Sequence, residues 1–214
     1  GPTMMLQLQA QAERFGTKVH IGMATKAEFS EKEGGIHKIT IDGSKVIYAK
    51  TVIISTGATA KYLGLPSEQR LRGGGVSACA VCDGFFYKNQ DVAIVGAGDT
   101  AAEEATYLSN ICKSVTMLVR KDKMRASKAM QHRVENTPNL RVLYNTEVEE
   151  VLGDQVVEGL KMINNFTNET SEIAITGLFI AIGHKPNTDI FADQLTMDET
   201  GYLITDEKNE KTEI

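Results

Sequence analysis

One stretch of the chain decides its fold: Val92-Ala93-Ile94-Val95-Gly96-Ala97-Gly98-Asp99-Thr100-Ala101. Its apolar start predicts a buried strand over 91–96, and the residues after the two glycines predict a helix over 100–110. In such a strand–turn–helix unit, Gly96 permits the tight turn and Gly98 lets the backbone approach a pyrophosphate. Ala101 takes the third small position, where the helix packs on the strand. The stretch therefore predicts a dinucleotide-binding α/β fold.

The start of the predicted helix suits phosphate groups, because its first N–H groups are unpaired and its dipole is positive there. Asp99 or Thr100 is a candidate cap for this helix. The alternative is a glycine turn that joins a strand to a helix and binds no ligand.

The strand predicted over 114–119 is followed by cations where a carboxylate would favour NAD. An acidic side chain at this point holds the ribose 2′-hydroxyl. This chain has Arg120 and Lys121 instead, with Arg125 further on, and three cations suit a 2′-phosphate. The pattern predicts NADPH, and the alternative is a solvated basic face.

A dithiol motif, Cys79-Ala80-Val81-Cys82-Asp83, precedes the nucleotide motif. This spacing lets the two sulfurs form one disulfide, and Asp83 is a candidate proton donor to a leaving thiolate. Half of a zinc site and a pair of buried structural thiols are the alternatives. No second Cys pair exists for zinc, and the four histidines lack ligand spacing. Cys112 is expected to have no role. A redox dithiol beside an NADPH site predicts electron transfer from NADPH to a disulfide.

Patterns elsewhere predict further helices and strands, with two antiparallel meanders among them. Helices are expected over 4–15 and 127–136, and strands over 18–22, 24–30, 36–41, 45–48, 51–55, 140–144, 147–152, 159–164, 172–175 and 178–182. The apolar runs 51–55 and 178–182 are interpreted as buried strands. A glycine-rich loop over 60–75 and the segment 183–187 are candidate domain boundaries.

Bulk composition is that of a soluble globular protein: 214 residues, 42% hydrophobic and 24% charged. A net charge of −5 argues against a nucleic-acid partner, and no apolar run is long enough to span a membrane. Three cysteines with one close pair fit a cytosolic redox motif. Gly1-Pro2 fits a scar of tag removal, and we expect the chain to be a piece of a longer protein.

Residues 77–87, Ser-Ala-Cys-Ala-Val-Cys-Asp-Gly-Phe-Phe-Tyr, closely resemble the active-site segment of the low-molecular-weight, bacterial-type thioredoxin reductases. The resemblance covers essentially the whole chain. It includes the segments 55–58, 62–68, 102–105, 107–110, 120–122, 125–126 and 177–187. It implies an α/β fold in which a Rossmann-like, three-layer NADPH domain, a parallel sheet plus a β-meander, is inserted in an FAD domain of the same type. By resemblance, residues 62–187 are the NADPH domain, and 1–61 and 188–214 are parts of an incomplete FAD domain.

The resemblance also implies a mechanism and its residues. NADPH passes hydride to FAD, which reduces the Cys79–Cys82 disulfide; Cys82 is the sulfur nearer the flavin, Cys79 attacks thioredoxin, and Asp83 is the acid. The implied NADPH contacts are Gly96, Gly98, Asp99, Thr100, Arg120, Lys121, Arg125, Gly183 and His184, and the FAD contacts are Thr56, Gly57 and Ala58. The two domains rotate against each other during turnover. A cytoplasmic homodimer with thioredoxin as partner, no metal and no membrane is implied as well.

Two departures from the family pattern matter. The amino-terminal Gly-x-Gly-x-x-Gly that holds the FAD pyrophosphate and the carboxy-terminal Gly-Asp segment that contacts the flavin are absent. Lys121 also stands where an arginine is common. We therefore expect this chain to carry little FAD, to show no NADPH-driven reduction of thioredoxin, and to expose apolar surface over 51–55.

Three other interpretations stay open. One is a relative of the flavoprotein subunit of alkyl hydroperoxide reductase, although that family is expected to use NADH and to have an acidic residue where Arg120 stands. The second is an NADP-binding dithiol module without catalysis, and the third is a non-catalytic redox sensor.

Overall fold

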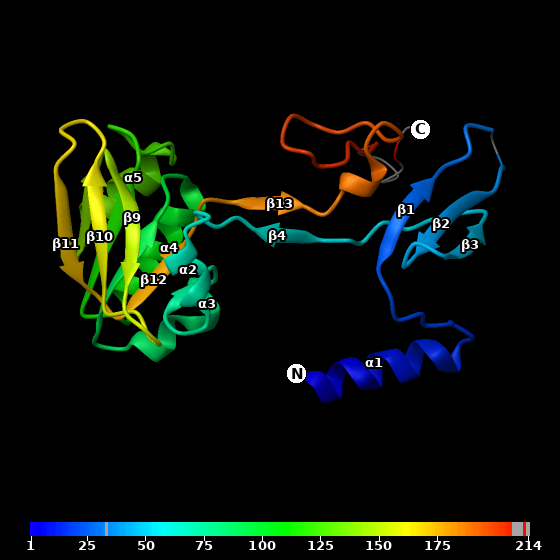
Figure 1. The fold of residues 1–214 in the computed structure, drawn as a ribbon, viewed down its shortest axis with the longest axis horizontal. Coiled ribbons are helices and arrows are strands. Elements are labelled where there is room, and N and C mark those ends of the chain that lie inside the picture. Colours follow the sequence, from blue (N-terminus) through cyan, green and yellow to red (C-terminus); the bar gives the residue numbers. More distant parts are fainter. Residues whose placement is uncertain (33, 207–211, 213–214) are drawn as a thin grey trace. The chain divides into compact units, whose positions relative to one another are not determined.

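The computed structural model describes residues 1–32, 34–206 and 212, and the chain divides into two compact units. Unit 1 comprises residues 1–57 and 186–214, and unit 2 comprises residues 58–185. The two passages between them run as strands β4 (Ala58–Ala60) and β13 (His184–Pro186), which pair as a two-stranded sheet (Figure 1). The resemblance implied boundaries of the NADPH domain between residues 61 and 62 and between residues 187 and 188. The assignment of each unit to a cofactor stays a prediction.

Unit 2 is built on a five-stranded sheet whose neighbouring strands are all parallel. In spatial order the strands are β5 (Val76–Ser77), β12 (Gly177–Ile180), β6 (Asp91–Val95), β7 (Ser114–Val119) and β8 (Leu140–Tyr144). The strands predicted over 91–96, 114–119, 140–144 and 178–182 are confirmed. Parallel strands need crossover segments, and two of these are the predicted helices α4 (Asp99–Ser109) and α5 (Lys128–Glu135).

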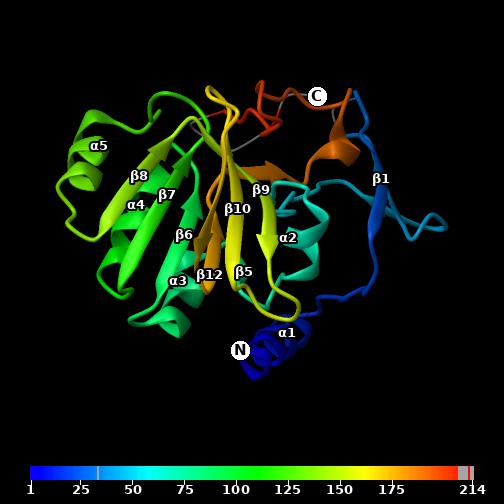
Figure 2. The same ribbon diagram turned by 60° about the vertical axis from the view of Figure 1, so that its left-hand side comes forward.

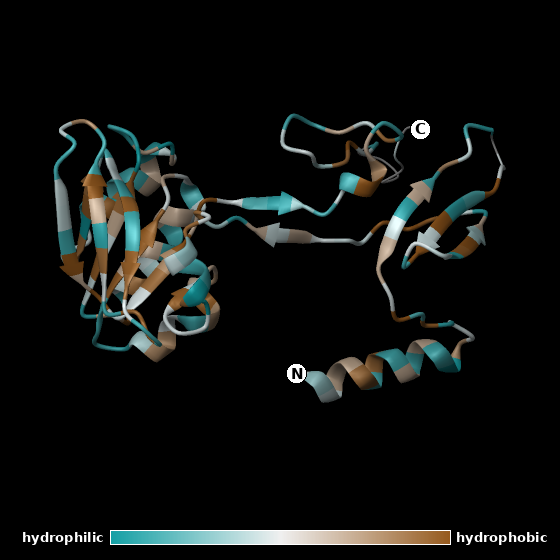
Figure 3. Cartoon of the chain, viewed as in Figure 1, coloured by the Kyte–Doolittle hydropathy of each residue, from teal (hydrophilic) through white to brown (hydrophobic). Residues whose placement is uncertain are grey.

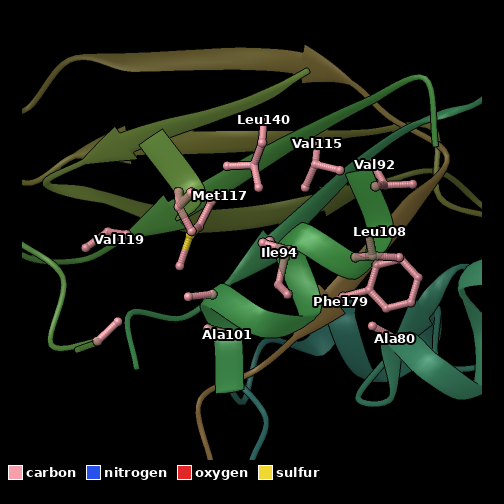
Figure 4. Packing of buried hydrophobic residues seen from close by; sticks show 14 of the residues in the cluster. Ala80, Val92, Ile94, Ala101, Leu108, Val115, Met117, Val119, Leu140 and Phe179 are labelled. Carbon is pink, nitrogen blue, oxygen red and sulfur yellow. The ribbon is translucent and has the colours of Figure 1, made fainter. Parts of the chain in front are cut away.

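The sheet lies between the helices on one face and the second meander on the other (Figure 2). The meander consists of β9 (Thr146–Leu152), β10 (Gly159–Asn164) and β11 (Thr170–Ala174). Successive side chains of a strand point to opposite faces. Accordingly, Val92 and Ile94 of β6 pack with α4 (Figure 4), whereas Ala93 and Val95 pack toward the meander. Burial on both faces explains the continuous apolar runs in these strands, and the predicted three-layer arrangement is confirmed.

Three short elements position the segment before β6: α2 (Pro66–Arg70), α3 (Ala80–Asp83) and the 3-10 helix η1 (Gly84–Tyr87). The stretch over 60–75, predicted to be rich in loops, contains one short helix, α2. Glu68 explains this local order. Its fully buried carboxylate accepts the backbone N–H groups of Leu63 and Gly64, each at 2.9 Å.

Unit 1 contains α1 (Pro2–Arg14) and the first meander, β1 (Ala24–Glu28), β2 (His37–Ile41) and β3 (Lys45–Ala49), followed after residue 186 by the 3-10 helix η2 (Asp189–Phe191). The predicted amino-terminal helix and meander are confirmed. The core of this unit is small, with Ala27, Phe191 and Leu195 fully buried. Gln194 joins its two parts, accepting the N–H of Phe29 and donating to the carbonyl of Ala27, both at 2.8 Å.

Two predicted strands of unit 1 are wrong. Residues 18–22 and 51–55 are irregular and pair with no strand among the described residues. An apolar β-branched run favours a strand, but the strand forms only where another backbone is available to pair with it. Ile53 is 92% exposed, so the expected apolar surface over 51–55 is present. Figure 3 shows apolar ribbon gathered in the sheet of unit 2, whereas α1 carries both apolar and polar positions and, as described, buries none of its side chains.

Candidate active site

The turn after β6 contains two glycines, Gly96 in crowded surroundings and Gly98 beside open space. A Cβ on Gly96 would lie 2.4 Å from the carbonyl oxygen of Ala181 and 2.6 Å from the Cβ of Ala101. Gly96 also has a φ of +158°, a backbone angle that residues with a side chain rarely adopt. A Cβ on Gly98 would meet no described atom within 4 Å. The first glycine therefore permits close packing of the turn, and the second leaves space at the start of α4 for a ligand.

The start of α4 has a glycine as its N-cap. Gly98 has no side chain with which to cap the helix, and the prediction that Asp99 or Thr100 is the cap is wrong. Asp99 instead accepts the backbone N–H of Ser127 at 2.9 Å. Hydrogen bonds from the backbone and hydroxyl of Ser127 hold the pKa of Asp99 below its ordinary value. Asp99 thus ties the helix start to α5, and the uncapped N–H groups remain available to phosphate.

The cations of the predicted 2′-phosphate site surround this turn. Strands β6 and β7 are parallel neighbours, so Gly96 and Arg120 follow them at the same edge of the sheet. Farther along the loop after β7, the N–H groups of Arg125 and Ala126 donate to the carbonyl of Ala97 at 2.7 and 2.9 Å. The side chains of Arg120, Lys121 and Arg125 are exposed. The structure therefore brings the glycine turn and the basic segment together.

Gly183 and His184 approach the same edge from the other side. They follow β12, which is parallel to β6, and the N–H of Ala181 donates to the carbonyl of Val95 at 2.8 Å. Both residues are exposed, and the carbonyl of Gly183 accepts the N–H of Lys61 at 2.9 Å. Their predicted contact with the nucleotide stays a prediction.

The space at Gly98 gives a direct test of nucleotide binding. The variant Gly98→Ala is expected to lower the affinity for NADP⁺ by about tenfold or more, because its methyl group fills the place where a pyrophosphate meets the backbone. Its free energy of unfolding should change by less than about 1 kcal/mol, because the poorer N-cap of alanine is offset in part by the lower entropy of its unfolded chain. Calorimetric titration and thermal unfolding measure the two quantities.

Gly96→Ala is the matched control for this test. Its Cβ would overlap backbone, so unfolding should become easier by about 1–3 kcal/mol. If Gly98→Ala leaves NADP⁺ binding intact, the open space is not a ligand site.

The two cysteines of the dithiol motif lie at α3 and are oxidised to a disulfide. Cys79 and Cys82 form a disulfide with their Cα atoms 5.3 Å apart, as the spacing predicted. Cys79 is the N-cap of α3, and its sulfur accepts the N–H of Cys82 at 3.2 Å. Cys79 is half-buried and Cys82 is exposed. The redox roles assigned to the two sulfurs stay predictions.

Ser77 connects the dithiol to Asp83 and was given no role in the sequence analysis. Its hydroxyl accepts the N–H of Cys79 at 3.0 Å and donates to Oδ2 of Asp83 at 2.6 Å. Asp83 is thereby fixed one turn of helix from Cys79. Burial, and then the charge of Asp83, raise the pKa of Tyr87, so this phenol stays protonated near neutral pH. Position 77 lies two residues before the first cysteine, and its contact with Asp83 is a signal that a sequence pattern would miss.

Glu104 links the nucleotide helix to the dithiol segment. Burial raises the pKa of its carboxylate, on α4, and the backbone N–H of Ala80, the residue after Cys79, lowers it. One carboxylate oxygen, Oε2, is buried and has no hydrogen-bond partner among the described residues. Helix α4 therefore begins at the glycine turn and supports α3 within the same unit.

Cys112 is separate from this chemistry. It is a free, buried thiol, and burial raises its pKa to about 11. Since the thiolate is the reactive form, Cys112 is inert at neutral pH in the folded chain.

The predicted FAD contacts provide no phosphate cradle among the described residues. Thr56, Gly57 and Ala58 are exposed, and they lead into strand β4 and not into a helix. Asn187 holds them, donating from its side chain to the carbonyl of Thr56 and from its backbone to that of Gly57, each at 3.0 Å. A dinucleotide pyrophosphate needs a glycine turn followed by a helix, so these residues do not fit that part of FAD.

The described residues contain neither a metal-binding cluster nor a membrane-spanning helix. No group of three or more His, Cys, Asp or Glu side chains there is placed to hold a metal ion. No described helix is both long enough and apolar enough to cross a membrane.

Comparison with known proteins places this geometry in context. The family of the pyridine nucleotide-disulphide oxidoreductases matches residues 5–214. The thioredoxin reductase of Streptomyces coelicolor is 48% identical over 214 residues, covering all of this chain and 66% of that protein. The thioredoxin reductase of Rickettsia bellii is 45% identical, and the chain covers 69% of it. The chain thus spans about two thirds of the length of these relatives.

Solved structures agree with these relatives. The thioredoxin reductase of Lactococcus lactis, in its FR conformation, aligns with a TM-score of 0.77 and 33% identity over all of this chain and 69% of that one. The thioredoxin reductase of Giardia duodenalis aligns with a TM-score of 0.80 and 35% identity over 99% of this chain and 69% of that one. The Rossmann-like architecture expected from the sequence is confirmed.

Proposed function

Because this chain belongs to the pyridine nucleotide-disulphide oxidoreductases, and within them to the thioredoxin reductases, we propose that it binds NADPH and takes part in NADPH-dependent reduction of thioredoxin. The observation that carries this proposal is that both candidate sites lie against one helix, α4: the glycine turn precedes it, and Ala80 of the dithiol segment packs on it. Helix α4 starts at the open glycine turn and supports the Cys79–Cys82 segment through Glu104, within unit 2.

In the proposed reaction, the Cys79–Cys82 disulfide takes up two electrons and two protons to give two thiols. NADPH supplies both electrons and one proton as hydride, and solvent supplies the second proton. The reduced pair of cysteines then passes the two electrons and two protons to the disulfide of thioredoxin. In that step one thiolate attacks, a mixed disulfide forms, and the second thiolate releases it.

The residues of this chain have defined parts in that reaction. Cys79 is the proposed nucleophile toward thioredoxin and Cys82 the sulfur that resolves the mixed disulfide. Asp83, oriented by Ser77 at 2.6 Å, is proposed to give a proton to a departing thiolate and to take it back. For NADPH, Gly98 and the uncapped N–H groups of α4 would hold the pyrophosphate, and Arg120, Lys121 and Arg125 the 2′-phosphate.

A flavin supplies a two-electron relay between nicotinamide and disulfide in enzymes that use one. Because Thr56, Gly57 and Ala58 do not fit the pyrophosphate of FAD, we assign no step of the reaction to a flavin bound by the described residues. We propose FAD as a cofactor that the described residues do not hold by themselves, together with a homodimer and a cytoplasmic location, as the resemblance implies.

This proposal predicts that the 214-residue chain purifies without stoichiometric FAD and does not oxidise NADPH in the presence of thioredoxin. The physical reason is that the described residues offer one glycine turn between a strand and a long helix, and the basic segment matches that turn to NADPH. A visible absorption spectrum and the absorbance of NADPH measure both quantities. A yellow protein with one FAD per chain, or steady thioredoxin-dependent oxidation, would contradict it.

The half-reaction with thioredoxin tests the proposed function without any flavin. The chain is reduced chemically, freed of reductant and mixed with oxidised thioredoxin, and the thiols of each protein are counted after alkylation. We expect two thiols to pass from each reacting chain to thioredoxin. An NADP-binding module or a redox sensor would transfer none, and the relation to alkyl hydroperoxide reductase is disfavoured by Arg120, which suits NADPH.

A further inference from the structure

The hairpin tip between β10 and β11 reaches across to the loop that follows β7. The side-chain amide of Asn165 donates to the backbone carbonyl of Arg120 at 2.7 Å and to Oε1 of Glu147 at 2.9 Å. Both hydrogens of that amide are therefore used. Residue 165 is 45 positions from Arg120 in the chain, so the contact exists only in the folded protein.

A second set of hydrogen bonds holds the next cation of the same loop. The backbone N–H of Asn165 donates to the carbonyl of Asn145 at 2.7 Å, and the N–H of Asn145 donates to the carbonyl of Lys121 at 3.0 Å. Asn145 has a φ of +52°, a conformation that asparagine tolerates better than most residues. The backbone carbonyls of Arg120 and Lys121 thus accept hydrogen bonds from Asn165 and Asn145, respectively.

The tip itself is built to present Asn165. Oδ1 of Asn164 accepts the backbone N–H groups of Phe166 and Thr167, both at 3.0 Å, which fixes the turn on either side of Asn165. Glu147 orients the amide from β9.

Fixing the backbone of the basic loop matters because the cations are exposed. An arginine fork binds a phosphate through paired donors of fixed geometry, and a loop that must become ordered on binding loses affinity. Anchored carbonyls at Arg120 and Lys121 hold the two Cα atoms in place before the ligand arrives. This benefit applies to a ligand that carries the 2′-phosphate and not to one that lacks it.

We propose that Asn165, whose side-chain amide bonds the Arg120 carbonyl and Glu147, is a positioning residue that sets the preference for NADPH over NADH by anchoring the loop of Arg120 and Lys121. This inference rests on the proposed function, in which that loop holds the 2′-phosphate. It gives the meander a part in cofactor selection in addition to covering the sheet.

The test is calorimetric titration of the whole chain and its Asn165→Ala variant with NADP⁺ and with NAD⁺ at one ionic strength. The affinity for NADP⁺ is expected to fall about 5- to 20-fold in the variant, the size of a lost hydrogen bond plus the loss of order. The affinity for NAD⁺ should stay within about twofold, since NAD⁺ has no 2′-phosphate for this loop to hold. The ratio of the two affinities is the readout that a general loss of stability would not move.

Two further variants show whether Asn165 acts through Arg120. Thr167→Ala is the matched control, because its hydroxyl lies in the same tip and bonds Glu169 at 3.2 Å; it should leave both affinities unchanged. In an Arg120→Ala background, Asn165→Ala should lower NADP⁺ affinity much less than in the native chain, because the two effects share one contact. Independent, additive losses would overturn the proposal.

The outcomes separate the inference from the proposed function. If the native chain binds NAD⁺ as tightly as NADP⁺, the proposed function fails. If the native chain prefers NADP⁺ and Asn165→Ala keeps that ratio, the inference fails alone. Should Asn165→Ala lose its circular-dichroism signal, Glu147→Ala replaces it, removing the second acceptor of the amide; a two- to fivefold, NADP⁺-selective loss is expected on the order of a weakened hydrogen bond, and an unchanged ratio overturns the inference.

Discussion

The Cys79→Ser variant, reduced and mixed with oxidised thioredoxin, is expected to transfer no thiols. The native chain should reduce thioredoxin until the two couples balance, near −270 mV, a value typical of thioredoxins. The reason is that exchange requires two thiolates on one protein, one to attack and one to release the mixed disulfide. Thiols of both proteins are counted by mass after alkylation.

Two companion variants define the roles of the sulfurs. Cys112→Ser is the control and should behave as the native chain, because Cys112 is buried and its pKa is raised to about 11. Cys82→Ser should accumulate a mixed disulfide between Cys79 and thioredoxin, visible on a non-reducing gel. If the adduct forms with Cys79→Ser instead, the two sulfurs have exchanged roles; transfer by Cys79→Ser would refute the dithiol mechanism.

The Arg120→Ala variant is expected to bind NADP⁺ more weakly by about 1.5–3 kcal/mol, the contribution of a charged hydrogen bond, or about 10- to 150-fold. Binding of NAD⁺ should be unaffected, because it has no 2′-phosphate to lose. The native chain is correspondingly expected to prefer NADP⁺. Calorimetric titration with both nucleotides measures these affinities, and the difference should shrink as salt screens the exposed charges.

Lys128→Ala is the matched control for Arg120. Lys128 is also an exposed cation near the basic segment, but its ammonium lies 3.4 Å from Oε1 of Gln131 on α5. Its loss should change NADP⁺ affinity by less than about threefold, as for an unpaired surface charge. If both variants lose the same affinity for NADP⁺, the basic residues attract the nucleotide only through their summed charge and not through a specific contact of Arg120.

Much of unit 2 could be predicted because its signals are local. The apolar runs of β6, β7 and β8 specify buried strands, since each must be covered on both faces. The glycines after β6 specify a tight turn at a helix start. The Cys79–Cys82 disulfide was predictable as well, because three residues of separation keep the sulfurs within bonding reach.

Predictions failed where a structure depends on a partner that the local sequence does not name. Residues 51–55 have the composition of a strand, yet no described strand pairs with them and Ile53 is 92% exposed. Asp99 is a residue type that often caps helices, yet its carboxylate accepts a hydrogen bond from the backbone N–H of Ser127. In both cases the local preference is worth little against the available hydrogen-bond partner.

The sequence by itself determined the kind of chemistry: a nucleotide turn, a basic segment after the next strand and a redox dithiol. Only the tertiary structure decided how those parts are held. Ser77 fixes Asp83, Glu104 joins α4 to the dithiol segment, and Asn165 anchors Arg120 from a different layer of the fold. Motifs are written in neighbouring residues, whereas positioning comes from hydrogen bonds between residues that folding alone brings within about 3 Å.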